Sequence, residues 1–382
     1  MPVTSELTEE LRSIAKDFVT ARCNQWIARE WDERCHYPKE LFDEIAQLGW
    51  LGIGVLEEDG GSGGSALDLI VVCEELGRGS TDLVACLSLT VSGLRTLVHH
   101  GTDDQRATLV PKLMDGSRRL SISISEPDAG SDSASLSTSA VRRDEETYVV
   151  SGQKTWCEAA EHPGTIIQLF ARTEKTERKH QGISMFLLEN DAPGVEIRRL
   201  PTLGRNITGV CEIFLDEVEL PMTSLVGPEH GAWRMIQSEL PLERLIIASG
   251  FIGATFQVLE DVLEHVKERE QFGQPVGNFQ GVAHPLVDLF TRAEATRLLI
   301  YEGARLHDVG EDCVKEASMA KLASSELYAD AVRSAMLLMG GYGYIREHPL
   351  TMHIPDSVIA PVAGGPSQIM RNIVARSLGL RP

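Results

Sequence analysis

The chain has 382 residues, of which 42% are hydrophobic and 24% charged, as in an ordinary globular protein of two or three domains. Its 56 acidic residues outnumber its 36 basic ones and give a formal net charge of −20. Such a chain is a poor non-specific nucleic-acid binder, because binding phosphates requires clustered cations. The seven cysteines are scattered, odd in number and without a C-x-x-C pair, which argues against a disulfide framework or a zinc site.

No targeting or membrane segment is evident in the sequence. Charges interrupt each apolar run before the ~18 residues needed to cross a bilayer. The N-terminus is acidic and polar, unlike a signal peptide with its basic and then apolar regions. We therefore expect a cytoplasmic protein that binds neither nucleic acid nor membrane.

From about Leu7 to Leu113 the sequence predicts helices. Apolar residues recur at three- and four-residue spacing in ELTEELRSIAKDFV and in PKELFDEIAQLGWLGI. The glycine-rich segment Glu57–Ser65 between such stretches reads as a loop. It lacks the G-x-G-x-x-G pattern or the lysine of a phosphate-binding loop.

The pattern changes near Leu120 and again near Gly231. Short β-rich runs such as YVVSGQKTWC and TIIQLFARTE alternate with turns, and long amphipathic helical stretches then fill the rest of the chain. We therefore predict an α+β fold with three domains. These are an N-terminal all-α domain (1–119), a middle β-barrel-like domain (120–231) and a C-terminal four-helix bundle (232–382).

Six short blocks inside this pattern are specific. In chain order they are SEPDAGSD (Ser125–Asp132), GQKTW (Gly152–Trp156), FLDEVELP (Phe214–Pro221), REQFGQPVGNFQ (Arg269–Gln280), GGYGY (Gly340–Tyr344) and PSQIMRNIVAR (Pro366–Arg376). In order and spacing they resemble the blocks of the acyl-CoA dehydrogenase family, over nearly the whole chain. The resemblance implies that family's fold, a bound FAD and oxidation of the α,β bond of an acyl thioester.

The resemblance also implies which residues bind FAD. Ile124 and Ser125 would line the flavin, and Trp156 would offer its ring a flat apolar surface. Arg269 and Gln280 would meet the pyrophosphate and adenosine, often those of a neighbouring subunit's cofactor. The full implied set is Ile124, Ser125, Ser131, Trp156, Glu158, Arg269, Phe272, Gln280, Gly340, Gly341 and Gln368.

The catalytic base is implied at an alternative position. Most of the family carries a glutamate in the C-terminal loop, where this chain has Gly364. Relatives resembling isovaleryl- and long-chain acyl-CoA dehydrogenases instead place it on the first bundle helix, immediately before an arginine. That pairing occurs here as Glu243-Arg244, so Glu243 is the predicted general base. Read without the resemblance, Glu243 could be a glutamate at a helix N-terminus that interacts favourably with the helix dipole.

The substrate site is implied in the same way. The backbone N–H of Gly364 would donate to the thioester oxygen as it becomes enolate-like. The remaining substrate positions are Ser131, Leu242, Arg244 and Gly365.

Four positions depart from the family pattern and predict an unusual substrate or a weakened FAD site. Glu158 replaces a hydroxyl residue near the flavin and could place a negative charge there. Leu337 and Pro366 replace a glutamine and a threonine, and Pro355 replaces the arginine of an Arg-Asp pair.

The expected partners are an acyl-CoA or acyl-carrier-protein substrate, an electron acceptor such as an electron-transfer flavoprotein, and further copies of the chain in a homotetramer. Two alternatives remain open. One is a flavin oxidase, monooxygenase or elimination enzyme on the same fold, and the other is a catalytically degenerate structural subunit.

Overall fold

The computed structural model describes residues 4–381, which divide into two compact units. The helical unit comprises residues up to 34, 65–85 and those from 241 onward. The β unit comprises residues 35–64 and 86–240. Each unit is discontinuous in sequence, so the three domain boundaries expected above stay a prediction.

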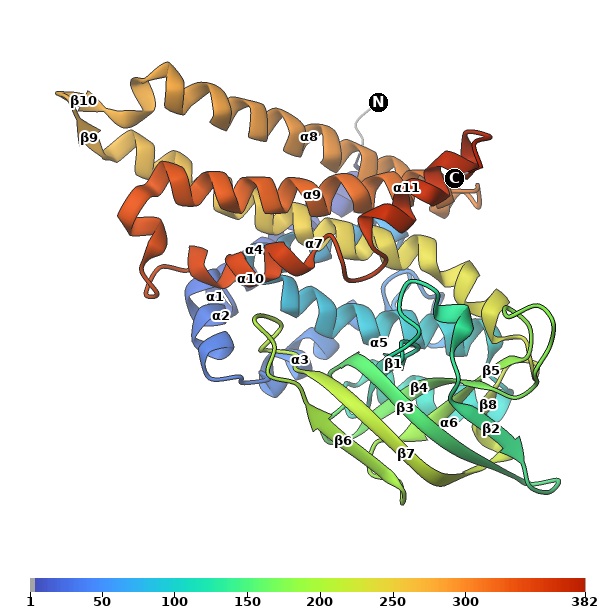
Figure 1. The fold of residues 1–382 in the computed structure, drawn as a ribbon. Coiled ribbons are helices and arrows are strands. Elements are labelled where there is room, and N and C mark those ends of the chain that lie inside the picture. The colour runs from blue at the N-terminus through green and yellow to red at the C-terminus, as the bar shows by residue number, and fades with distance from the viewer. Residues whose placement is uncertain (1–3, 382) are drawn as a thin grey trace. The chain divides into compact units, whose positions relative to one another are not determined.

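The helical unit is built from long helices. Its N-terminal part has α1 (Glu6–Arg22), α2 (Gln25–Glu33) and α4 (Ala66–Gly79). Its C-terminal part has most of α7 (Ala232–Glu268), then α8 (Gln280–Asp308), α9 (Val314–Met339), α10 (Leu350–Ile359) and α11 (Ser367–Ser377). Figure 1 shows α8 and α9 running side by side, with α11 along α9. Helix α7 contacts both α8 and α9, through Leu245 beside Gly303 and through Phe251 stacked on Tyr328.

Glycines let the backbones of α4 and α7 touch. A Cβ at Gly253 would lie 1.9 Å from the carbonyl oxygen of Glu74, and one at Gly77 would lie 2.3 Å from that of Gly250. A larger residue at either position would force the helices apart. The start of α4 is fixed by a capping box in which Ser65 and Asp68 each bond the other's backbone N–H.

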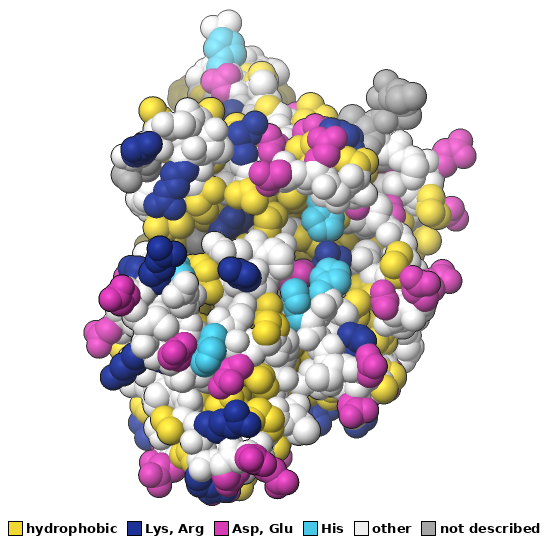
Figure 2. All heavy atoms as spheres, turned by 90° about the vertical axis from the view of Figure 1, so that its right-hand side faces the viewer, with side chains coloured by type: hydrophobic (Ala, Val, Ile, Leu, Met, Phe, Trp, Pro, Cys, Tyr) yellow, Lys and Arg dark blue, Asp and Glu magenta, His cyan; other side chains and the backbone are white. Residues whose placement is uncertain are grey.

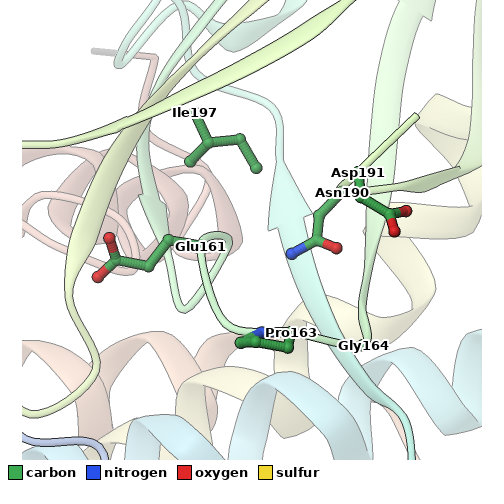
Figure 3. Close-up of a pocket in the computed structure, with 6 residues that line it drawn as sticks. All are labelled: Glu161, Pro163, Gly164, Asn190, Asp191 and Ile197. Atoms are coloured by element: carbon green, nitrogen blue, oxygen red, sulfur yellow. The ribbon is translucent and has the colours of Figure 1, made fainter. Parts of the chain in front are cut away.

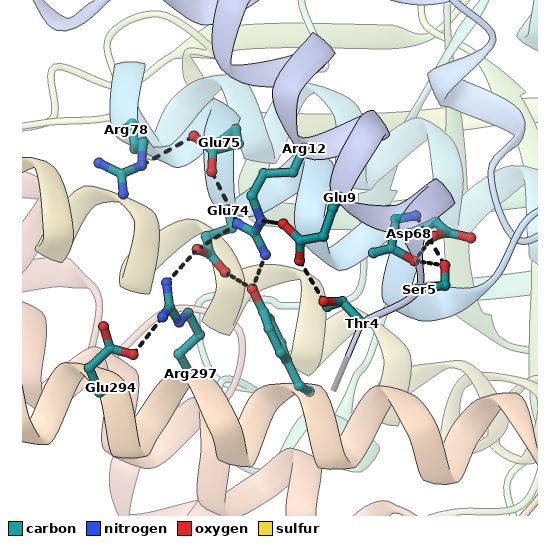
Figure 4. Close-up of polar contacts among 12 residues, drawn as sticks. Thr4, Ser5, Glu9, Arg12, Asp68, Glu74, Glu75, Arg78, Glu294 and Arg297 are labelled. Carbon is teal, nitrogen blue, oxygen red and sulfur yellow. Dashed lines mark hydrogen bonds and ion pairs between the residues drawn. The ribbon is translucent and has the colours of Figure 1, made fainter. Parts of the chain in front are cut away.

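A buried carboxylate joins three helices of this unit (Figure 4). Glu74 on α4 is 0% exposed and accepts hydrogen bonds from Arg12 of α1 at 3.0 Å and from the Tyr301 hydroxyl of α8 at 2.7 Å. Arg297 of α8 lies 3.7 Å from the same carboxylate. These cations and the hydroxyl offset the cost of burying the Glu74 charge.

The β unit is organised around one sheet. Its strands are β1 (Arg119–Ser123), β2 (Ser139–Arg142), β3 (Thr147–Glu158), β4 (Thr165–Arg172), β5 (Ile183–Glu189), β6 (Val195–Arg199), β7 (Val210–Pro221) and β8 (Leu225–Val226). The order is β6-β7-β3-β2-β4-β5-β8, with β1 parallel to β4. The unit also holds α3 (Lys39–Gln47), most of α5 (Thr81–His100) and α6 (Asp103–Met114). Apolar side chains of β3, β4, β5 and β7 alternate inward and form its core.

The predicted order of helices, β domain and helical bundle is confirmed. Two helices, α5 and α7, contain 18-residue windows apolar enough to cross a bilayer by composition and length. Most of each window is buried, 83% and 78%, as in core helices of a folded protein.

Candidate active site

Two predicted flavin segments of the β unit are tied together by a buried ion pair that the sequence reading missed. The ammonium of Lys154, on β3, donates to the Glu126 carboxylate at 2.8 Å and to the carbonyl of Ile124 at 3.1 Å. The Thr155 N–H donates to the carbonyl of Ser125 at 3.0 Å. Lys154 is 0% and Glu126 4% exposed. Ile124 and Ser125 are therefore held against the strand that carries Trp156.

The Glu126 carboxylate is satisfied on all sides. It also accepts hydrogen bonds from the backbone N–H of Ser137 at 2.6 Å and of Thr138 at 2.9 Å. Burial alone would raise the pKa of Glu126, but the Lys154 ammonium and these hydrogen bonds outweigh it and lower the pKa to about 2. Glu126 lies within the SEPDAGSD block and Lys154 within the GQKTW block. Both are buried polar residues, and only their place in those blocks could have singled them out.

Trp156 is turned out of the sheet at an irregularity. The β3–β7 register shifts between Lys154 and Cys157, so the residues between them form a bulge. Trp156 has a φ of +61°, which is uncommon for a non-glycine residue, and its side chain is 62% exposed. Backbone strain that exposes a large aromatic ring points to a binding role.

Glu158, the departure expected to put a negative charge near the flavin, has a cationic partner. The Nε atom of Arg205 lies 3.6 Å from its carboxylate, and Arg205 is only 7% exposed. The backbone carbonyl of Glu158 accepts a hydrogen bond from Ser121 at 2.7 Å. The Glu158–Arg205 pair has no net charge, so the negative charge expected at Glu158 is compensated within the β unit.

Ser131 lies in the turn that follows β1 and is exposed. Its neighbour Asp132 is paired with Lys179 at 2.6 Å and with Ser135 at 2.5 Å, which fixes the end of the motif. The Ser131 side chain is therefore presented on an anchored turn.

In the helical unit, Glu243 lies well inside α7 and not at a helix start. The helix begins at Ala232 and continues through Pro241. An interaction with the dipole of a helix N-terminus is confined to the first turn, so it does not account for Glu243. Glu243 is half-buried.

The loop position Gly364 lies against the face of α7 that carries Glu243. Ile247 follows Glu243 by one helical turn, so their side chains share a face. A Cβ at Gly364 would stand 2.8 Å from the Ile247 Cδ1 atom, and Gly364 has a φ of +63°. Within residues 4–381 the Gly364 N–H makes no hydrogen bond, so it is an available donor. Gly365 follows it with a φ of +98°.

The other substrate positions of α7 are buried. Leu242 is 3% and Arg244 8% exposed. Arg244 donates weakly to the Ser318 hydroxyl, at 3.4 Å, and its Nε has no hydrogen-bond partner. Burial lowers the pKa of Arg244, and the Glu243 charge opposes this. A desolvated guanidinium with unused hydrogen-bonding capacity is suited to an anionic or carbonyl ligand.

The predicted FAD residues of the bundle lie in exposed segments. Arg269 and Phe272 belong to the hairpin of β9 (Glu270–Gln271) and β10 (Gln274–Pro275), which projects beyond α9 in Figure 1. Phe272 and Gly273 form its turn with φ of +53° and +79°, and Phe272 is 95% exposed. Gln280 is the first residue of α8 and is also exposed.

Gly340 and Gly341 begin a 3₁₀ turn (Gly340–Tyr344) after α9, and a Cβ at either would meet nothing within 4 Å. Leu337, where a glutamine was expected, is 75% exposed. Gln368 lies in the first turn of α11 and is exposed. These positions leave backbone open for a ligand to approach.

A separate hollow of about 340 Å³ lies in the β unit (Figure 3). None of its lining residues was predicted to bind cofactor or substrate. The side-chain amide of Asn190 donates hydrogen bonds to the carbonyls of Ala160 and His162, and Glu161 is paired with Arg199 at 2.8 Å. The Asn190 and Glu161 side chains thus have protein partners, and no ligand is assigned to the hollow.

Sequence models of three domains match nearly the whole chain. They are described as the N-terminal (residues 5–117), middle (121–218) and C-terminal (230–379) domains of acyl-CoA dehydrogenase. An acyl-CoA dehydrogenase of Bacillus subtilis (strain 168) is 32% identical, with 99% of both chains covered. The chain belongs to the acyl-CoA dehydrogenase family.

Other relatives of this family member differ in their reactions. The caffeyl-CoA reductase–Etf complex subunit CarC of Acetobacterium woodii is 29% identical, with 98% of both chains covered. Among solved structures, butyryl-CoA dehydrogenase of Megasphaera elsdenii has 28% identity and a TM-score of 0.92 over 98% of both chains. The prolyl acyl carrier protein oxidase AnaB has 25% identity and a TM-score of 0.91 over 99% of this chain and 100% of that one. PigA in complex with FAD has 27% identity and a TM-score of 0.93 over 99% of both.

The family, the FAD cofactor and the reaction class expected from the six blocks are confirmed: the protein is an FAD-dependent oxidoreductase acting on CH–CH groups. The residues present fit FAD. Trp156 offers an exposed aromatic face, Arg269 a guanidinium for phosphate, and Gly340 an open backbone. The roles of individual residues stay predictions.

Proposed function

We propose that the protein is an acyl-thioester dehydrogenase in which Glu243 removes the α-proton. The observation that carries this proposal is the packing of Gly364 against Ile247, one turn from Glu243. A side chain at Gly364 would adopt a strained positive φ and displace the end of the Ile247 side chain, which disfavours a base in the loop. A carboxylate on that face of α7 can serve the same substrate carbon instead.

The chemistry divides between carboxylate and backbone. Bound FAD supplies the acceptor for the β-hydride. The Glu243 carboxylate takes the α-proton, and the free N–H of Gly364 donates to the thioester oxygen as negative charge develops there. Glu243 is half-buried, and a bound substrate that excludes water would disfavour its charged form and so favour uptake of the α-proton.

Cofactor binding is assigned to two groups of residues. In the β unit, the anchored backbone at Ile124 and Ser125 and the exposed ring of Trp156 would hold the flavin. In the helical unit, Arg269, Phe272, Gln280, Gly340, Gly341 and Gln368 would hold the pyrophosphate and adenosine.

The substrate thioester is taken to be an acyl-CoA, with an acyl carrier protein as the second possibility. Relatives named as CoA enzymes support the first, and the carrier-protein oxidase supports the second. Figure 2 shows Lys and Arg side chains interspersed with Asp and Glu on the face it presents. Such mixing does not favour docking of a strongly acidic carrier domain on that face.

An electron-transfer flavoprotein is the proposed electron acceptor, supported by the Etf complex in which one relative takes part. The family resemblance and the exposed apolar residues of the bundle support a homotetramer. A cytoplasmic location is proposed from the sequence alone.

The oxidase alternative is favoured by one observation, the likeness to an oxidase of the same fold. Oxygen reactivity of the reduced flavin separates it from a dehydrogenase. A degenerate subunit without cofactor is less well supported, because Arg205 compensates the unusual Glu158.

The test is anaerobic reduction of the bound flavin by a panel of acyl-CoA and acyl-pantetheine thioesters of varied length and branching. Loss of flavin absorbance with at least one saturated thioester is expected. FAD-loaded protein that no saturated thioester reduces would contradict the proposal. Rapid reoxidation by dioxygen after reduction would select the oxidase alternative.

A further inference from the structure

Lys321, on α9, is an unusually placed lysine. It is 0% exposed, although lysine side chains are almost never fully buried. Its ammonium donates to the carbonyl oxygen of Ala360 at 2.9 Å and to that of Gly365 at 2.8 Å. These two carbonyls stand at the ends of residues 360–365, the loop that carries Gly364. One side chain of α9 therefore fastens this loop at both ends.

The same side chain lies close to Gly364 itself. A Cβ built at Gly364 would be 3.9 Å from the Lys321 Cε atom and 2.8 Å from the Ile247 Cδ1 atom. The Gly364 backbone is thus confined between α9, through Lys321, and α7, through Ile247. Further bonds within the loop, from Ala363 to the Ile359 carbonyl at 2.9 Å for example, leave the Gly364 N–H without an acceptor.

A backbone donor stabilises developing negative charge only if it is already aimed when the charge appears. A glycine with positive φ in a six-residue loop has many accessible conformations, and ordering it costs conformational entropy. The two hydrogen bonds from Lys321 remove much of that freedom before substrate binds.

We propose that Lys321 is a positioning residue of the reaction, which fixes the Gly364 N–H as donor to the thioester oxygen. The inference rests on the proposed function and deepens it. The step it assists is enolisation, in which the Glu243 carboxylate takes the α-proton. The C–H electron pair forms the carbon–carbon double bond of the enolate, and the carbonyl π pair moves onto the oxygen facing Gly364. Return of the proton restores the thioester, so this half-reaction needs no oxidant.

The experiment follows enolisation apart from flavin reduction. The FAD-loaded enzyme is titrated with a β-keto thioester, whose enolate absorbs in the near ultraviolet, and the pH at which the bound ligand ionises is read from the spectrum. Exchange of α-protons for deuterium in a saturated thioester that wild type accepts is followed in parallel by NMR. The variants are Lys321→Met, which removes the ammonium at similar length, and the control Lys315→Met, at an exposed lysine of the same helix.

For Lys321→Met we expect ionisation of the bound ligand to move upward by at least about one pH unit and α-exchange to slow at least about 10-fold. Binding of the saturated thioester should change by less than about threefold, and Lys315→Met should match wild type. If Lys321 only stabilises the loop, Lys321→Met would weaken thioester binding and leave the pH at which the bound ligand ionises unchanged. That result would overturn the proposal. If Lys321→Met does not fold, Lys321→Gln, whose shorter amide cannot reach both carbonyls, is read in the same way.

Different results would overturn the proposed function and the role of Lys321. A wild-type enzyme that neither exchanges α-protons nor is reduced by any thioester would overturn the proposed function. A working wild type whose Lys321→Met variant exchanges and ionises ligand normally would overturn only the role of Lys321.

Discussion

At the scale of single residues, the packing of Gly364 against α7 favours a catalytic base on that helix over one in the loop. Glu243 and Ile247 occupy successive turns of that face, and Gly364 packs on the second of them. A glycine in the loop and a carboxylate on the helix are therefore two parts of one arrangement. Replacing either part alone should have a different and measurable consequence.

Glu243→Gln tests the carboxylate. The amide keeps the size of the side chain but cannot accept a proton, so flavin reduction should slow by at least about 100-fold while FAD remains bound. The measurement is anaerobic bleaching with a thioester that wild type accepts, alongside the visible spectrum of bound flavin. Glu264→Gln, at an exposed glutamate of the same helix, is the control. Bleaching of Glu243→Gln at the wild-type rate would make Glu158 the next candidate for the base.

Gly364→Ala tests the steric argument. The positive φ alone costs roughly 1 kcal/mol, and the 2.8 Å approach to Ile247 adds to it, so a loss of about 2–3 kcal/mol in the free energy of unfolding is expected. Urea unfolding measures it. Gly310→Ala is the matched control, because its φ is +72° but no atom lies within 4 Å of an added Cβ. Equal losses in the two variants would show that Ile247 does not crowd the loop.

At the scale of secondary-structure elements, the sequence predicts those features that local patterns encode. The helices around α1 and α4, the β runs and the turn motifs follow from apolar spacing and from glycines. The continuation of α7 through Pro241 could not be predicted locally, because proline normally ends a helix and only packing sustains it here. Likewise the pairing of Lys154 with Glu126 in the core depends on the fold and could not be predicted from the local sequence.

Glu126 should make the stability of the predicted flavin segment of the β unit depend on pH. Its folded-state pKa of about 2 lies below the ordinary value of 4.5, so the stability it contributes is present above pH 4.5 and is lost as the pH falls toward 2. A shift of this size corresponds to about 3 kcal/mol. Glu126→Gln should remove that part of the acid dependence and, by leaving the Lys154 charge buried without its partner, lower stability at pH 7 by about 3–5 kcal/mol.

Unfolding in urea across pH 2–7 checks this, with FAD affinity at pH 7 as a second readout. Glu219→Gln is the control, since Glu219 pairs with Arg143 on the surface and is 62% exposed, and about 1 kcal/mol or less is expected. If Glu126→Gln and Glu219→Gln had equal effects, the pair with Lys154 would not anchor the segment.

Glu74 and its partners Arg12, Arg297 and Tyr301 should be the main polar interaction that stabilises the helical unit. Tyr301→Phe removes one hydrogen bond to a fully buried carboxylate and leaves Arg12 and Arg297 in place, so a loss of about 1.5–3 kcal/mol is expected. Thermal or urea unfolding measures it. Tyr344→Phe, at a tyrosine that is 80% exposed, should be neutral. A neutral Tyr301→Phe would mean that the cations alone satisfy Glu74.

At the scale of the whole molecule, the bundle exposes more apolar surface than a lone chain requires. Val287 and Leu298 on α8 are 60% and 53% exposed, and Leu337 on α9 is 75% exposed. Phe272 protrudes on its strained hairpin. Large exposed apolar side chains on a helical bundle favour an interaction surface, and identical chains most often meet in closed symmetric assemblies.

We therefore expect a homotetramer assembled through the C-terminal bundle, with a mass by light scattering four times that of the chain at micromolar concentration. Leu298→Glu should shift the population toward smaller species, because a charge would be buried without a partner at the interface. Asp288→Asn, at an exposed and already polar position of the same helix, should leave the mass unchanged. Because Arg269 and Gln280 are expected to reach a neighbouring subunit's cofactor, dissociation by Leu298→Glu should also weaken FAD binding. A monomeric wild type that holds FAD as tightly as expected would contradict both the assembly and the shared cofactor site.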